Sequence, residues 1–77
     1  MISAYPNPFN SATTITVAGG EEAEIAIYDI AGRKVTTLHT EHGRAVWAAK
    51  GVSSGVYFAR VAGENKASNI IKLIYIK

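Results

Sequence analysis

The chain has 77 residues, of which 48% are hydrophobic and 18% are charged, and it contains no cysteine. This composition is typical of one small globular domain, and it excludes a disordered tail, a disulfide scaffold and, because so short a chain buries only about 60% of its surface on folding, an enzyme with a deep cleft. The formal net charge is +2 and acidic residues are interspersed among the basic ones, so there is no basic stripe that would bind nucleic acid.

The first residues predict a linker that leads into a segment fixed by two prolines. Residues 1–4 lack the charged and apolar regions of a secretory leader, and we interpret them as a linker before a domain that spans residues 5–77. The sequence Tyr5-Pro6-Asn7-Pro8 predicts an extended opening segment, because each proline fixes its own φ and restricts the residue before it. Phe9 is expected to anchor this segment to the core.

Strand signals then recur at short spacing, and no window has a convincing helical period. The expected strands are bounded by glycine or polar turns and cover residues 11–17, 24–28, 33–40, 44–49, 56–61 and 67–76. The stretch Gly63-Glu64-Asn65-Lys66 predicts the hairpin turn before the last of them. Six or seven antiparallel strands at this spacing predict an all-β fold, a small immunoglobulin-like sandwich.

The alternation within these strands predicts the core. Tyr57, Ala59 and Val61 are assigned to the inward face of their strand, which leaves Arg60 outward. Val35 and Leu38 are three residues apart, which breaks the period of two and indicates a β-bulge or a change of face. The predicted core residues are Ile25, Ile27, Val35, Trp47, Tyr57 and Val61.

Two short motifs have a chemical and a structural interpretation. Gly51–Gly55 formally matches the G-x-S-x-G nucleophile elbow of hydrolases, but a strand is expected after Ser53 where the elbow needs a helix, and no histidine follows it. His39-Thr40-Glu41-His42 places two imidazoles near a carboxylate, yet the spacing fits no common zinc motif. We therefore expect a turn at the first motif and an exposed hairpin end at the second, with no catalytic residue, metal or cofactor.

The last stretch, Asn69–Lys77, is apolar apart from Lys72, Lys77 and its first residue. It can be a final strand that is buried on both faces, in which Lys72 opposes aggregation through the sheet edge. It can instead be a segment that is itself recognised. The pattern alone favours the first interpretation.

Three stretches, taken together, change this balance. They are Tyr5–Ile15 (YPNPFNSATTI), Ile27–Leu38 (IYDIAGRKVTTL), and Ser54–Val61 followed by Ile70–Lys77. In this order and spacing they resemble the type A C-terminal sorting domain of the type IX (Por) secretion system of Bacteroidetes. They are also similar to the immunoglobulin-like domain of the flagellar hook-assembly protein.

The resemblance implies a non-catalytic sandwich that follows a large N-terminal cargo domain. It implies passage through the periplasm, recognition by an outer-membrane translocon, removal by a sortase-like cysteine protease, and a secreted or cell-surface location. The motifs of the family fall on Pro6, Asn7, Pro8, Gly55, Val56, Tyr57, Lys72, Leu73, Ile74 and Lys77. A last strand at a sheet edge would present the two lysines to the machinery, and it would also allow a homodimer through edge strands.

Two other functions stay open at this stage. One is an accessory module that binds a cell surface or carbohydrate by stacking on exposed aromatic side chains. Its candidate aromatic residues are Tyr28, Trp47, Tyr57, Phe58 and Tyr75. The other is a purely structural immunoglobulin-like spacer.

Overall fold

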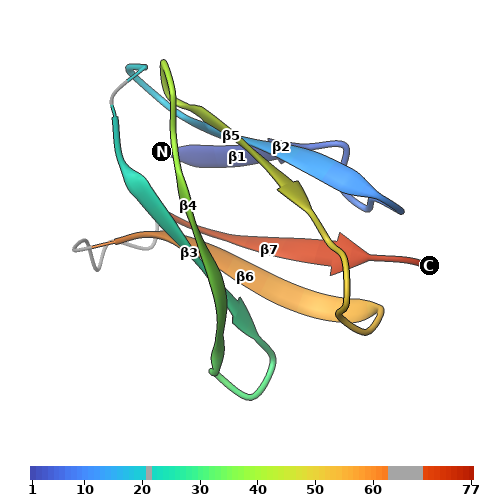
Figure 1. Ribbon diagram of the computed structural model, residues 1–77. Coiled ribbons are helices and arrows are strands. Elements are labelled where there is room, and N and C mark those ends of the chain that lie inside the picture. The colour runs from blue at the N-terminus through green and yellow to red at the C-terminus, as the bar shows by residue number, and fades with distance from the viewer. Residues whose placement is uncertain (21, 63–68) are drawn as a thin grey trace.

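The computed structural model describes residues 1–20, 22–62 and 69–77. Its strands are β1 (Ile2–Tyr5), β2 (Ala12–Val17), β3 (Glu24–Asp29), β4 (Lys34–His39), β5 (Arg44–Ala48), β6 (Gly55–Val61) and β7 (Ile70–Tyr75). They form a three-stranded sheet in the order β1-β2-β5 and a four-stranded sheet in the order β4-β3-β6-β7 (Figure 1). The paired strands are antiparallel. The predicted all-β sandwich is therefore confirmed.

The first strand differs from what the sequence pattern predicted. Residues 1–4 were interpreted as a linker, whereas Ile2–Ala4 lie in β1, which pairs with β2 in the register Ile2 to Val17 and Tyr5 to Thr14. Ile2 is also part of the core. A strand this short carries little signal of its own, because its conformation depends on the partner strand.

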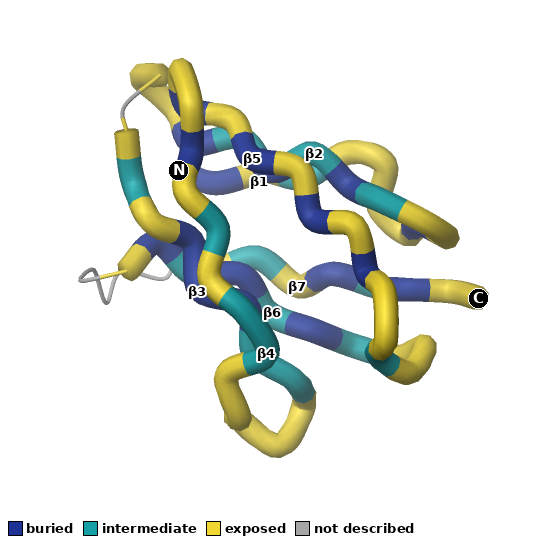
Figure 2. Tube along the Cα trace, in the orientation of Figure 1, coloured by how far each residue is buried: buried dark blue, intermediate teal, exposed yellow. Residues whose placement is uncertain are grey.

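The core lies between the sheets, and burial alternates along the strands that enclose it (Figure 2). In β6, Tyr57, Ala59 and Val61 are buried while Arg60 is only half-buried, as the predicted register requires. Of the other residues predicted for the core, Ile25, Ile27 and Trp47 are buried, and Val35 is half-buried and packs against them.

The hairpin of β3 and β4 contains the expected irregularity. Ile27 pairs with Thr36 and Tyr28 pairs with Lys34, so the register shifts and Val35 has no partner of its own. Such a bulge turns side chains that are three apart onto one face, and Val35 and Leu38 accordingly both contact the core. The hairpin turn and the strand start predicted at residues 63–67 lie outside the described residues.

At one end of the sandwich the turn after β2 and the turn after β4 touch. Gly43 has φ +79°, and a Cβ there would lie 2.6 Å from the Gly20 Cα and 2.9 Å from the Val17 carbonyl oxygen. The Val17 amide donates to the Gly43 carbonyl at 2.7 Å. Glycine is needed at position 43 both for the left-handed backbone and for this close approach. We call this region, residues 18–20, 22–23 and 39–43, the turn end.

Candidate functional site

The opening segment crosses from one sheet to the other. After β1 the chain leaves the three-stranded sheet, and Phe9 forms a parallel bridge with Tyr75. The Phe9 amide donates to the Ile74 carbonyl at 2.9 Å, and the Ile76 amide donates to the Phe9 carbonyl at 2.8 Å. Thr13 Oγ1 donates to the Pro6 carbonyl at 2.7 Å. The chain then returns to the first sheet as β2, so Phe9 covers the outer edge of β7.

The side chain of Asn7 also covers the outer edge of β7. Its Nδ2 donates to the Lys72 carbonyl at 2.8 Å, and its Oδ1 accepts from the Ile74 amide at 3.0 Å. A carboxamide carries one acceptor and two donors, so it can replace the peptide group of a neighbouring strand. Asn7 therefore pairs the backbone groups of an edge strand that would otherwise face solvent.

Four aromatic rings lie under this segment. Phe9 stacks on Tyr75 with ring centroids 5.3 Å apart and packs against Trp47 at 5.7 Å. Trp47 meets Tyr57 edge to face at 5.2 Å, and the Tyr57 hydroxyl donates to the Ser53 carbonyl. Offset and edge-to-face pairs of this kind add stability beyond the burial of their area. The opening segment is thus fixed to the core as well as to β7.

These contacts bring the residues of the three sequence motifs to one corner. β6 pairs with β7 in the register Gly55 to Tyr75 and Tyr57 to Leu73, and Asn7 lies on the other edge of β7. In Figure 1 this corner is at the right, at the C-terminal end of β7. We call it the terminal corner, and its members are Pro6, Asn7, Pro8, Gly55, Val56, Tyr57, Lys72, Leu73, Ile74 and Lys77.

The members of the terminal corner divide by exposure. Tyr57 and Leu73 are buried, so they support the corner from within. Val56 and Ile74 are half-buried, and the side chains of Asn7, Lys72 and the other members are exposed. A hollow of about 400 Å³ beside them is lined by Pro6, Pro8, Phe9, Asn10 and Ile76. The exposed members and this hollow are what a partner protein can touch.

The edge of β7 is not open to a further strand at the corner. Asn7 and Phe9 already take the outward-facing backbone groups of Lys72, Ile74 and Ile76. β7 is the edge strand of its sheet, as expected, but the opening segment covers this part of its edge. A partner strand would have to displace the opening segment first.

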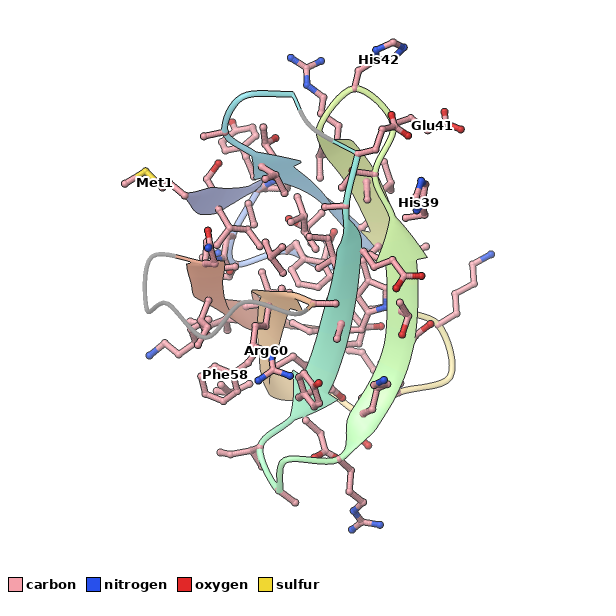
Figure 3. All side chains as sticks on the ribbon, turned by 90° about the vertical axis from the view of Figure 1, so that its left-hand side faces the viewer. Met1, His39, Glu41, His42, Phe58 and Arg60 are labelled. Carbon is pink, nitrogen blue, oxygen red and sulfur yellow. The ribbon has the colours of Figure 1, made fainter. Side chains whose placement is uncertain are left out.

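The two motifs with a chemical interpretation lie at the surface and make local contacts. Ser53 is exposed in the loop before β6, and its carbonyl holds the Tyr57 hydroxyl. His39 Nε2 lies 3.3 Å from Glu22 Oε1, and Glu22 Oε2 accepts from the His42 amide at 3.3 Å. Figure 3 shows His39, Glu41 and His42 together at the turn end. Among the described residues no group of three or more such side chains is placed to hold a metal ion.

The aromatic residues proposed for carbohydrate stacking are mostly inside the protein. Trp47, Tyr57 and Tyr75 are 4%, 6% and 7% exposed, respectively, and Tyr28 and Phe58 are half-buried. A flat sugar-binding platform made of all five rings is therefore not formed. In the part of the chain that the structure describes, no helix has the length and apolar character needed to cross a bilayer.

Comparison with protein families gives one result that covers almost the whole chain. The model of the family described as secretion system C-terminal sorting domain matches residues 3–77. No curated protein matches the chain. No solved structure matches it either.

Proposed function

Because the chain belongs to the secretion system C-terminal sorting domain family and is a sorting signal for type IX secretion, we propose that the terminal corner is the surface recognised by the outer-membrane translocon. The domain marks its cargo for export to the cell surface or the medium. A sorting signal acts by being recognised, so its function depends on the surface that the translocon contacts. We assign this contact to the exposed residues of the terminal corner.

The observation that carries the proposal is the pair of hydrogen bonds from Asn7 to the backbone of Lys72 and Ile74. They join residues 65 and 67 positions apart in the sequence. A partner that reads the opening motif therefore meets the terminal strand at the same place. Two weak linear motifs become one surface, which is more specific than either alone.

The charges at the corner are available to a partner. Lys72 and Lys77 are exposed, and the one ion pair among the described residues joins His39 to Glu22 at the other end. The free-energy cost of partly desolvating an exposed lysine is small. The charge of such lysines also steers association with an acidic partner surface. We assign them the contact with the translocon, and assign Tyr57 and Leu73 the support of the strand that carries them.

The remaining partners follow from the position of β1. We propose that the cargo domain joins the chain before Ile2, and that a sortase-like cysteine protease cuts on the cargo side of this residue. A cut inside Ile2–Tyr5 would remove a strand that pairs with β2. A homodimer through edge strands stays a prediction, for which β7 is poorly suited because Asn7 and Phe9 cover it.

The proposal is tested with charge variants that leave the fold intact. A fluorescent reporter with a signal peptide is fused before residues 1–77 in a bacterium with a working type IX system. The test variant is Lys72→Gln/Lys77→Gln. The matched control is Arg44→Gln/Lys50→Gln, which removes the same charge from exposed residues on and after β5.

We expect the test variant to keep its thermal midpoint and to accumulate in the periplasm, with export reduced about tenfold or more, while the control is exported normally. A tenfold change corresponds to about 1.4 kcal/mol of recognition, which two exposed ion pairs can supply. Equal export of the two variants would overturn the assignment of the lysines. Equal loss in both would show that the machinery senses net charge and not this corner.

A further inference from the structure

The outer faces of the two sheets differ in composition. In an antiparallel sandwich the face away from the core is normally polar. The three-stranded sheet follows this rule in most of its outward positions, which include Ser3, Thr14, Thr16 and Arg44, and its exposed apolar side chains there are Tyr5 and Val46. The four-stranded sheet does not. Its outward side chains on three neighbouring strands include Tyr28, Val56, Phe58, Ile70 and Ile74.

Three of these side chains, Tyr28, Phe58 and Ile70, line a hollow in the surface. It has a volume of about 360 Å³ and is lined by Tyr28, Asp29, Ile30, Gly32, Phe58, Arg60 and Ile70. Ile30 is 77% exposed and Ile70 is 42% exposed. The hollow is large enough for one or two side chains of a partner, and large exposed apolar residues that gather at one place mark interaction sites.

Arg60 gives this hollow a charge with a fixed position. Its guanidinium carbon lies 5.2 Å from the centroid of the Tyr28 ring, and its Nη2 donates to the Tyr28 hydroxyl at 2.9 Å. Figure 3 shows Arg60 beside Phe58, away from the histidines of the turn end. An arginine held on an aromatic ring keeps its planar fork ready for a carboxylate, and little side-chain freedom is lost on binding.

Arg60 contacts Tyr28 but has no acidic partner among the described residues. Its Nε is buried without a hydrogen bond, and no described carboxylate forms an ion pair with it. Asp29 lines the same hollow, but its Oδ1 accepts from the Ala31 and Arg33 amides and closes the hairpin turn. Lys34 and Lys72 add positive charge on either side of Tyr28 and Phe58.

We propose that this surface, formed by Tyr28, Phe58, Arg60 and Ile70, docks a protein segment in which a carboxylate stands beside large apolar side chains. The carboxylate pairs with Arg60, and an apolar neighbour fills the hollow between Phe58 and Ile70. Charge complementarity selects this occupant, because an apolar segment without an acid would leave Arg60 unpaired and partly desolvated. The inference rests on the domain being read by a protein partner, but it does not depend on the terminal corner.

The test uses two short blocked peptides and the isotope-labelled full chain. The probe is acetyl-Val-Phe-Asp-Leu-amide, and its matched partner carries Asn in place of Asp. We expect saturable NMR shift changes at Tyr28, Phe58, Arg60 and Ile70 with the Asp peptide, and at least about fivefold weaker binding of the Asn peptide. Arg60→Gln should reduce affinity for the Asp peptide to that for the Asn peptide. Arg44→Gln, on the other sheet, should change nothing.

Several results would overturn the proposal. They are equal binding of both peptides, shift changes confined to other surfaces, and no saturable change with either peptide up to about 2 mM. Shifts of the same residues with protein concentration alone would assign the surface to a second copy instead. If Arg60→Gln loses its dispersed spectrum, Phe58→Thr, which keeps a strand-forming residue, replaces it and should also weaken binding at least about fivefold.

The same variants separate this surface from the terminal corner in cells. If Phe58→Thr and Arg60→Gln bind the peptide poorly and are exported poorly, while the lysine variant is exported normally, the corner assignment fails and the docking surface stands. If the lysine variant alone is retained and the peptide does not bind, the docking surface fails and the corner stands.

Discussion

The terminal corner and the turn end close the same sandwich by different means. At the terminal corner, Asn7 and Phe9 join β7 across more than sixty positions of the sequence. At the turn end, two tight turns meet through Gly20 and Gly43, and Thr40 Oγ1 accepts from the Ala23 amide at 2.7 Å. Both ends stabilise the fold, but only the terminal corner contains the residues that we propose for recognition, with the exposed Lys72 and Lys77 among them. Substitutions at the terminal corner should therefore reduce export by more than their loss of folding stability accounts for.

The largest effect is expected from Phe9→Ala, which empties a site in the aromatic cluster. Phe9 is 3% exposed and contacts Trp47 and Tyr75, and truncation of a buried phenylalanine costs about 3–5 kcal/mol. Denaturant unfolding measures the loss. Tyr5→Ala is the control, because Tyr5 is 82% exposed and its truncation should cost less than about 0.5 kcal/mol. Similar losses in both would show that the opening segment is not anchored by Phe9.

The second largest effect is expected at Gly43, where a comparison with Gly32 separates the cost of backbone strain from the cost of the steric contact at the turn end. Gly43→Ala should destabilise by about 2–3 kcal/mol, because the left-handed backbone and the contact with Gly20 both oppose a Cβ. Gly32→Ala is the matched control, since its φ is +86° and no atom lies within 4 Å of its Cβ position. It should cost only about 1 kcal/mol. Export of Gly43→Ala should recover at lower growth temperature, because only its folding is impaired.

A smaller effect on stability, with a larger one on export, is expected from Asn7→Ala. Loss of the two hydrogen bonds to Lys72 and Ile74 should cost about 1–2 kcal/mol and speed hydrogen exchange of the Ile74 amide. Asn10→Ala, at an exposed asparagine nearby, should leave that exchange unchanged. If the Ile74 amide exchanges at the same rate in both variants, Asn7 does not hold β7 in solution.

The smallest effect is expected at the His39 and Glu22 pair. Both side chains are 61% exposed, and surface ion pairs contribute little once solvent screens them. His39→Gln should change the free energy of unfolding by less than about 0.5 kcal/mol and leave export as it is. A marked export defect without a stability change would place recognition at the turn end as well, and the contrast between the ends would not hold.

Much of the fold was readable from alternation and turn residues. The strands expected at 11–17, 24–28 and 44–49 correspond to β2, β3 and β5 within one or two residues at each end, because each has one buried face and a turn on either side. β1 was missed, since its four residues take their conformation from pairing with β2. Local hydrophobic alternation predicts where strands lie, but it does not predict which strands pair with one another.

The candidate site shows the same limit more sharply. The residues of the corner were named from a resemblance to a family, and no spacing rule would have joined Asn7 to Lys72 and Ile74. The two prolines around Asn7 predicted only an extended segment. That the Asn7 side chain pairs with a strand at the other end of the chain depends on the folded sandwich. The apolar outer face around Arg60 could not be predicted from the sequence either. The alternation in β6 assigns each side chain to one face of the sheet, but it does not show whether another part of the chain covers that face.

The most direct test of the account is site-specific photo-crosslinking during export. A photoreactive amino acid replaces Ile76, which is 52% exposed in the hollow of the terminal corner, or Val46, which is 62% exposed on the other sheet. The account predicts an adduct with the outer-membrane translocon from position 76 and none from position 46. Adducts of equal yield from both positions, or from position 46 alone, would contradict it.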